Sequence, residues 1–117
     1  MDRKELWLLS EKEVIRLGIP LRCKGYYYLI IAVVLSVETG MNKASLSKDI
    51  YCRIAELHEV STQSVEKCIR NCVIKAWSDE KSGLREICSS SRKKPTNGEI
   101  IAYISSRIRL ETAIRVW

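Results

Sequence analysis

The chain has 117 residues, a length typical of one domain that buries a hydrophobic core without disulfide staples. Its formal net charge of +6 and pI of about 9.2 favour a polyanionic partner such as DNA, although a soluble basic protein that binds no polyanion has the same balance. A lone histidine, His58, with no recognisable acid–base constellation argues against an enzyme.

The cysteines indicate a reducing compartment rather than a disulfide framework. There are five of them, an odd number without a CxxC pair, and the apolar run in MDRKELWLL is too short for a secretion signal. We therefore expect a cytoplasmic protein whose thiols act as small core residues. Cys68 and Cys72 are four residues apart and could share a metal ion. With one histidine available, no zinc site and no cofactor are expected.

Residues 3–17 have the spacing of an amphipathic helix. Ser10 followed by Glu13 has the form of a capping box, so the helix alternatively begins there. Gly18 and the Ile19-Pro20 pair predict its end.

The run from Tyr26 to Val37 is strongly apolar but shorter than the about 20 residues needed to span a bilayer. It predicts a buried helix that Gly40 ends, and no membrane association. Three consecutive tyrosines point in three directions around such a helix. At least one hydroxyl should therefore reach solvent or a polar partner.

A helix-turn-helix is predicted in the middle of the chain. Ser45 or Ser47 can cap the first helix, and the turn is expected at 58–60. Ser61 or Thr62 can cap the second helix, which runs to about residue 78. The apolar seam of the first helix comprises Leu46, Ile50, Ile54 and Leu57.

The predicted helix 61–78 has two faces of opposite character at about 100° per residue. One face is apolar and comprises Val65, Ile69, Cys72 and Ala76, with Val73 at its edge. The other face is short, polar or cationic and comprises Ser64, Lys67, Arg70, Asn71 and Lys75. The polar face suits base edges and phosphates of double-stranded DNA, but a solvated helix face has the same pattern.

The remaining chain predicts a short helix at 84–88, a basic loop at 89–94 and a last helix introduced by a Thr96–Glu99 capping box. Ile114 and Trp117 extend the apolar pattern, either onto the domain's own core or toward a dimer contact. The buried side of this helix comprises Ile100, Ile101, Ile104 and Ile108. We expect a compact all-α domain over 1–117 with five to six helices.

Several motifs, taken together and in order, resemble one family. They include LGIP at 17–20, KGYYYL at 24–29, LSK with IY and IA at 46–55, VEK with IR at 65–70, AW at 76–77, KPTN with Glu99 at 94–99, and RLE at 109–111. This chain resembles the C-terminal effector domain of the stage-zero sporulation protein A, the response regulator that initiates sporulation, over about 17–111. The resemblance implies a compact helical domain with a helix-turn-helix.

The resemblance also implies a function. Its members regulate transcription by placing the second helix in the major groove of a box resembling TGTCGAA, usually as paired copies on tandem boxes. The family's groove-reading positions fall on Ser64, Lys67, Arg70 and Asn71, of which Arg70 matches; the family usually has two arginines and a histidine at the other three. A family contact with the RNA polymerase sigma subunit falls near the 89–94 loop. We expect phosphate or polymerase contacts at Ser61, Thr62, Arg92, Lys93 and Lys94.

The family's full-length members carry an N-terminal receiver domain, for which the residues before Leu17 are too few. Either such a domain was cut away or the chain is a free-standing effector, and the initiating methionine favours the second. Phosphorylation in cis would then not control it. The departures at Ser64, Lys67 and Asn71 leave an alternative: a protein-interaction module of the same fold that modulates a related regulator or RNA polymerase without specific DNA binding.

Overall fold

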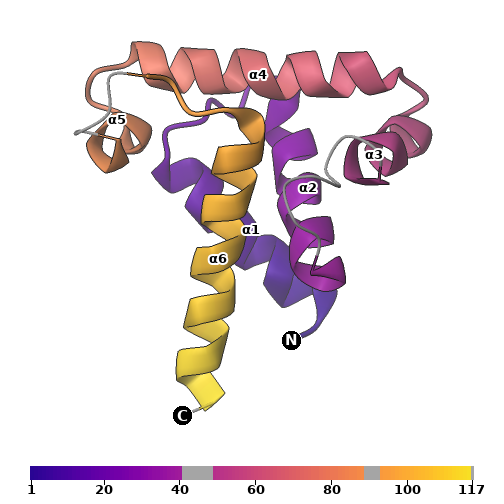
Figure 1. Ribbon diagram of the computed structural model, residues 1–117, viewed down its shortest axis with the longest axis vertical. Coiled ribbons are helices and arrows are strands. Elements are labelled where there is room, and N and C mark those ends of the chain that lie inside the picture. Colours follow the sequence, from indigo (N-terminus) through magenta and orange to yellow (C-terminus); the bar gives the residue numbers. More distant parts are fainter. Residues whose placement is uncertain (41–48, 89–92, 117) are drawn as a thin grey trace.

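The computed structural model describes residues 1–40, 49–88 and 93–116, with side chains described as far as Ile114. Within these ranges the chain forms six helices and no strand, which confirms the all-α prediction. Figure 1 shows α4 lying across one end of α1, α2 and α6, with α3 and α5 near its two ends. The helices are α1 (Arg3–Arg16), α2 (Gly25–Thr39), α3 (Tyr51–His58), α4 (Thr62–Ser78), α5 (Gly83–Ile87) and α6 (Asn97–Val116).

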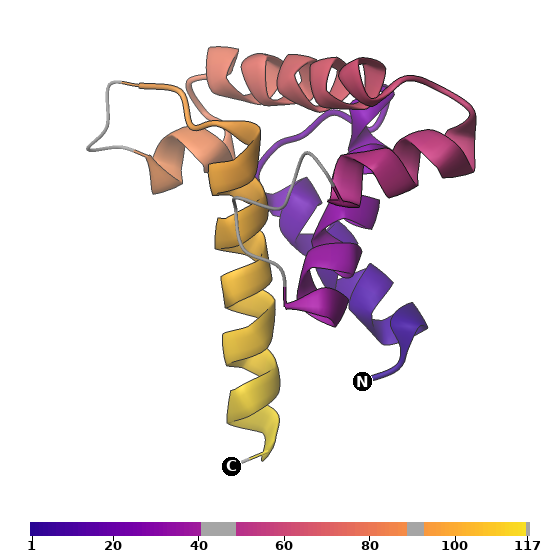
Figure 2. The same ribbon diagram turned by 45° about the vertical axis from the view of Figure 1, so that its right-hand side comes forward.

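The core is built around α2, which packs against α1, α4 and α6. Its apolar residues are buried on several sides of the helix, as the run from Tyr26 to Val37 predicted. Figure 2 shows the same arrangement after rotation, with α2 beneath α4. No helix in the described ranges combines the length and apolar character needed to cross a membrane.

The first helix begins earlier than the Ser10 capping box would allow. Asp2 caps it by accepting a hydrogen bond from the Glu5 backbone N–H at 2.8 Å. Ser10 lies inside the helix, buried, and its hydroxyl donates to the Leu6 carbonyl at 2.7 Å. The helix 3–17 prediction is confirmed, and the alternative start at Ser10 is wrong because its hydroxyl is engaged four residues back.

The three tyrosines of α2 point in different directions, as predicted. Tyr26 is buried, and its hydroxyl donates to a Glu11 carboxylate oxygen at 2.7 Å. Tyr27 is half exposed and stacks with Trp7. The Tyr28 ring meets the His58 ring edge-on. The single apolar run therefore supplies both core contacts and contacts at the surface.

Two apolar residues expected in the core lie outside it. Leu57 is 68% exposed because α3 ends one residue later and the chain turns at Glu59, whose φ is +55°. Ile114 is 66% exposed, so the alternative in which it packs on the domain's own core is wrong. The Ser45 or Ser47 cap, Leu46 and Trp117 lie outside the described residues.

The start of α6 is confirmed as a capping box. The Glu99 backbone N–H donates to the Thr96 hydroxyl at 3.1 Å, and the Thr96 backbone N–H donates to the Glu99 carboxylate at 3.0 Å. Four isoleucines of α6 are buried as predicted: Ile100, Ile101, Ile104 and Ile108.

Candidate nucleic-acid interface

Helices α3 and α4 pack together and are joined by a tight turn, as a helix-turn-helix requires. The left-handed Glu59 redirects the chain after α3, and the Val60 backbone N–H donates to the Ala55 carbonyl at 3.0 Å. Ser61 then caps α4, because its hydroxyl accepts from the Ser64 backbone N–H at 3.0 Å. The turn thus fixes where the longer helix begins.

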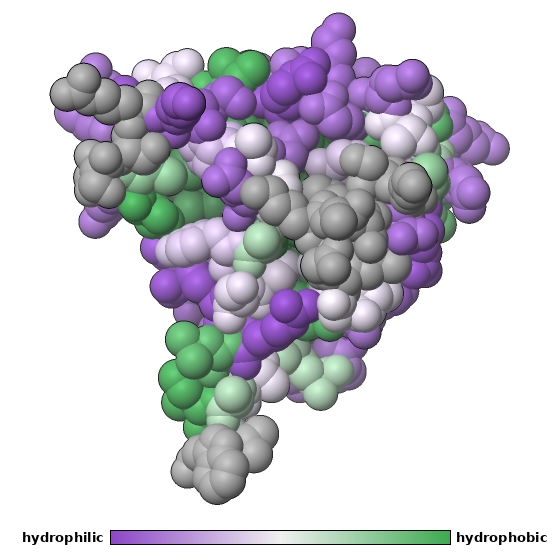
Figure 3. Space-filling view, in the orientation of Figure 1, coloured by the Kyte–Doolittle hydropathy of each residue, from purple (hydrophilic) through white to green (hydrophobic). Residues whose placement is uncertain are grey.

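The two faces of α4 are segregated as its periodicity predicted. The core side is fully buried and comprises Val65, Ile69, Cys72, Val73 and Ala76. The outer side carries the predicted contact residues: Lys67, Arg70, Asn71 and Lys75 are exposed, and Ser64 is partly exposed. Figure 3 shows mostly hydrophilic surface along the edge where α4 lies, interrupted by a small hydrophobic patch. The structure therefore brings the five residues together on one face.

A close backbone contact holds α4 against α2. A Cβ added at Gly25 would lie 2.2 Å from the Cys68 carbonyl oxygen and 2.8 Å from the Cys72 sulfur. Only glycine allows this approach without a shift of one helix. Burial, together with the neighbouring Cys23 thiol, raises the pKa of Cys72 to about 12, so this thiol stays protonated at neutral pH.

The start of α6 also holds α4. The Asn97 side-chain amide, largely buried, donates to the Glu66 backbone carbonyl at 3.1 Å. A helix carbonyl that already accepts its own helical bond can accept a second one through its other lone pair. This contact joins the start of α6 to the second turn of α4.

Arg70 is engaged on its own helix. Its Nη1 donates to both carboxylate oxygens of Glu66, at 2.9 and 3.1 Å. Both side chains are more than a third exposed, so a pair of this kind contributes only a few tenths of a kcal/mol. Such a weak pair leaves the guanidinium available for a stronger acceptor. The Arg70–Glu66 pair was not predicted from the sequence, although the four-residue spacing is its usual signal.

The remaining predicted contacts divide into two groups. Thr62, partly buried, lies beside Ser61 in the first turn of α4, and its Oγ1 is 3.7 Å from the Cys52 sulfur. Lys93 is exposed and Lys94 partly exposed just before α6. Arg92 lies outside the described residues. The first turn of α4 and the approach to α6 are thus separate parts of the surface.

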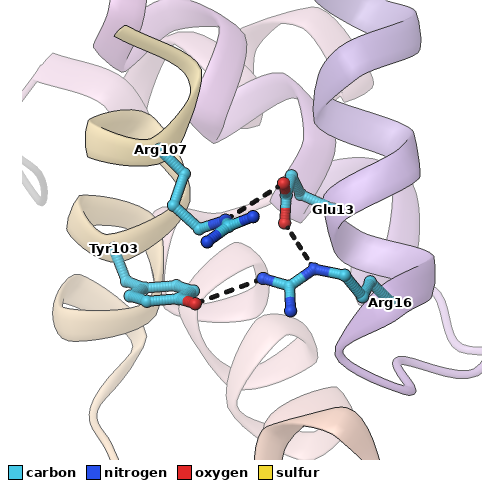
Figure 4. Close-up of polar contacts among 4 residues, drawn as sticks. All are labelled: Glu13, Arg16, Tyr103 and Arg107. Atoms are coloured by element: carbon cyan, nitrogen blue, oxygen red, sulfur yellow. Dashed lines mark hydrogen bonds and ion pairs between the residues drawn. The ribbon is translucent and has the colours of Figure 1, made fainter. Parts of the chain in front are cut away.

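An ionic cluster joins α1 to α6 away from this face (Figure 4). Glu13, almost buried, accepts from Arg16 Nε at 2.9 Å and from Arg107 Nε at 3.1 Å. Arg16 also donates to the Tyr103 hydroxyl at 3.2 Å, and this contact raises the Arg16 pKa. From the sequence, Glu13 was interpreted only as the partner of Ser10 in a capping box, because pairing across about 90 residues has no local signal. We assign the cluster to the packing of the two helices.

The described residues hold no group of three or more histidine, cysteine or acidic side chains arranged for a metal ion. His58 is exposed at the end of α3, and its ring contacts Tyr28.

One of the known protein families matches most of the chain. The family model described as "Sporulation initiation factor Spo0A C terminal" matches residues 11–108, which includes α2 to α5 and the first half of α6. The matched range contains every residue of the outer face of α4.

Proposed function

Because the chain belongs to the Spo0A C-terminal domain family, a non-enzymatic family of DNA-binding transcription activator domains, we propose that it regulates transcription by reading specific duplex DNA with α4 in the major groove. The observation that carries this proposal is the segregation of α4: five polar or cationic residues on the outer side and five buried residues behind them. A helix held by its inner side can enter a groove without losing its support.

Each outer residue has a defined role in the proposal. Arg70 exchanges its Glu66 partner for guanine, to which arginine offers two parallel donors. Lys67 supplies a single-point contact to guanine or phosphate, and Asn71 suits adenine. Ser64 lies at the first of the family's groove-reading positions and contacts a base edge through its hydroxyl. Lys75, together with Ser61 and Thr62 in the first turn of α4, contacts phosphates and sugars.

The departures at Ser64, Lys67 and Asn71 bear on the target. Lysine lacks the two parallel N–H donors through which arginine makes a bidentate contact with guanine. The preferred box therefore differs from TGTCGAA at the base pairs that Ser64, Lys67 and Asn71 contact. We propose that the chain binds such boxes in tandem as paired copies. Lys93, Lys94 and Arg92 provide the contact with the sigma subunit of RNA polymerase.

The test is fluorescence anisotropy of a labelled duplex with two tandem TGTCGAA boxes against a scrambled duplex, at two salt concentrations. Preference for the boxes that persists at higher salt supports specific reading. Equal and salt-sensitive binding to both duplexes supports DNA binding with a different target, to be found by selection from random duplexes. Binding to neither would overturn the proposal in favour of a protein-interaction module of the same fold.

A further inference from the structure

The end of α6 carries an apolar surface that the domain does not cover. Leu110 is 63% and Ile114 66% exposed, although they lie one helical turn apart on the same side of the helix. Figure 3 shows the corresponding hydrophobic surface over the lower part of α6, where the helix extends beyond its neighbours. With Arg107 and Glu111 these two residues line an open depression of about 190 Å³.

The charges beside this surface are self-complementary. Arg107 and Glu111 are also one turn apart, and at 100° per residue they form a column alongside Leu110 and Ile114. When two identical helices pack antiparallel about a two-fold axis, each flank meets its own copy with the direction reversed. The positive end of the column then meets the negative end of the other. Arg107 of each copy therefore lies opposite Glu111 of the second.

We propose that two copies of this chain associate through the ends of their α6 helices, antiparallel about a two-fold axis near Leu110. The apolar pair forms the centre, and the Arg107 and Glu111 columns form the rim. Arg107 donates to Glu13 through its Nε, so its terminal guanidinium N–H groups can donate to Glu111 of the second copy. The second copy is the occupant that the pattern fits, since it supplies both the matching apolar pair and the opposite order of charges.

This contact differs from one between copies on tandem DNA boxes. Tandem copies point the same way along the duplex, so any contact between them joins two different surfaces. The α6 contact joins the same surface of each copy. In Figures 1 and 2 the end of α6 points away from α4, so a pair joined there presents its two α4 helices on opposite sides. Such a pair can hold two separate duplexes.

The contact is small. The apolar centre consists of two side chains per copy, well below the about 1,200 Å² of a standard stable interface. We therefore expect a transient dimer, seen by sedimentation velocity of the whole chain without DNA between roughly 10 and 500 μM. A chain that stays monomeric over this range overturns the proposal. Since no DNA is present, the result is independent of whether the proposed target is right.

Two variants probe the axis directly. Leu110→Glu should weaken dimerisation by about tenfold or more, because it places two carboxylates near the axis. Leu21→Glu, at a residue of matched exposure (62%) in the α1–α2 connection, should leave it unchanged. Equal weakening by both variants would overturn the proposal, with circular dichroism verifying the helical content of each.

A charge swap distinguishes a two-fold contact from non-specific apolar association. Leu110→Glu and Leu110→Lys chains should each be monomeric alone and should pair when mixed, because opposite charges then meet at the axis. Failure of the mixture to pair, with wild type dimeric, would reject the antiparallel arrangement.

Discussion

Asn97 at the start of α6 donates its side-chain amide to the backbone carbonyl of Glu66 in α4, 31 residues earlier, at 3.1 Å. Asn97→Asp removes this donor and sets a carboxylate against a carbonyl oxygen. The free energy of unfolding should fall by about 1–3 kcal/mol, measured by urea denaturation. Asn71→Asp, on the exposed side of α4, is the matched control and should change stability by less than about 0.5 kcal/mol. Equal losses in both variants would contradict an anchoring role for Asn97.

The contact at Gly25 predicts a severe effect from one methyl group. Gly25→Ala places a Cβ 2.2 Å from the Cys68 carbonyl oxygen, so α2 and α4 must separate. We expect a loss of about 1–3 kcal/mol in unfolding free energy, as in other overpacked cores, and weaker DNA binding.

Gly40→Ala is the comparison, since no atom lies within 4 Å of its added Cβ and its only strain is a φ of +67°. That strain costs about 1 kcal/mol and should leave DNA affinity unchanged once the protein is folded. A Gly25→Ala variant with wild-type DNA affinity would show that α4 tolerates the shift.

The base-reading role of Arg70 predicts a loss confined to specific binding. Arg70→Ala should cost about 1–3 kcal/mol on the preferred duplex and less on a scrambled one, measured by anisotropy titration. Lys4→Ala removes an exposed cation from α1 and should leave both affinities nearly unchanged. If Arg70→Ala weakens binding to both duplexes equally, Arg70 contacts the backbone and not a base.

The buried thiol of Cys72 predicts a loss of stability in alkaline solution. Its pKa is raised to about 12 in the folded chain, against about 8.5 for an unfolded cysteine. Between these values the unfolded chain releases a proton that the folded chain retains, so unfolding free energy falls as pH rises. The contribution is intact below pH about 8.5 and falls by at most about 1.4 kcal/mol per pH unit above it.

Urea denaturation between pH about 7.5 and 9.5 tests this expectation. Cys72→Ala should be less stable than the wild type at neutral pH, but its free energy of unfolding should fall less steeply as the pH rises. Val73→Ala, equally buried, should be less stable with the wild-type pH slope. Identical slopes in the two variants would exclude Cys72 as the titrating group.

The fold was largely predictable because its signals are local. The buried side of α4, the Thr96–Glu99 capping box and the apolar α2 follow from periodicity and cap chemistry within a few residues. The outer face of α4 was predictable for the same reason. Ser10 misled because a serine followed by glutamate three residues later marks a helix start only where its hydroxyl is free to cap.

What could not be predicted depends on contacts distant in sequence. The Glu13 ion pair with Arg107 and the Asn97 bond to Glu66 join residues that only the packed fold brings together. Leu57 and Ile114 continue an apolar period beyond the point where their helices have neighbours. The period alone therefore assigned Leu57 to the core and left Ile114 open between the core and a dimer contact. Lys93 and Lys94 lie just before α6, and the polymerase contact expected of them stays a prediction.

The two-sided build of α4 has a consequence for how such a protein diverges. Ser64, Lys67 and Asn71 take no part in the core, so under the proposed function their replacement changes what the helix recognises while the fold retains its support. Position 25, in contrast, accepts no side chain, and the inner residues of α4 can change only together with their neighbours. Substitutions are therefore tolerated mainly on the outer surface of α4. Under the proposed function, a duplicated gene can acquire new DNA targets there one substitution at a time, and each intermediate protein still folds.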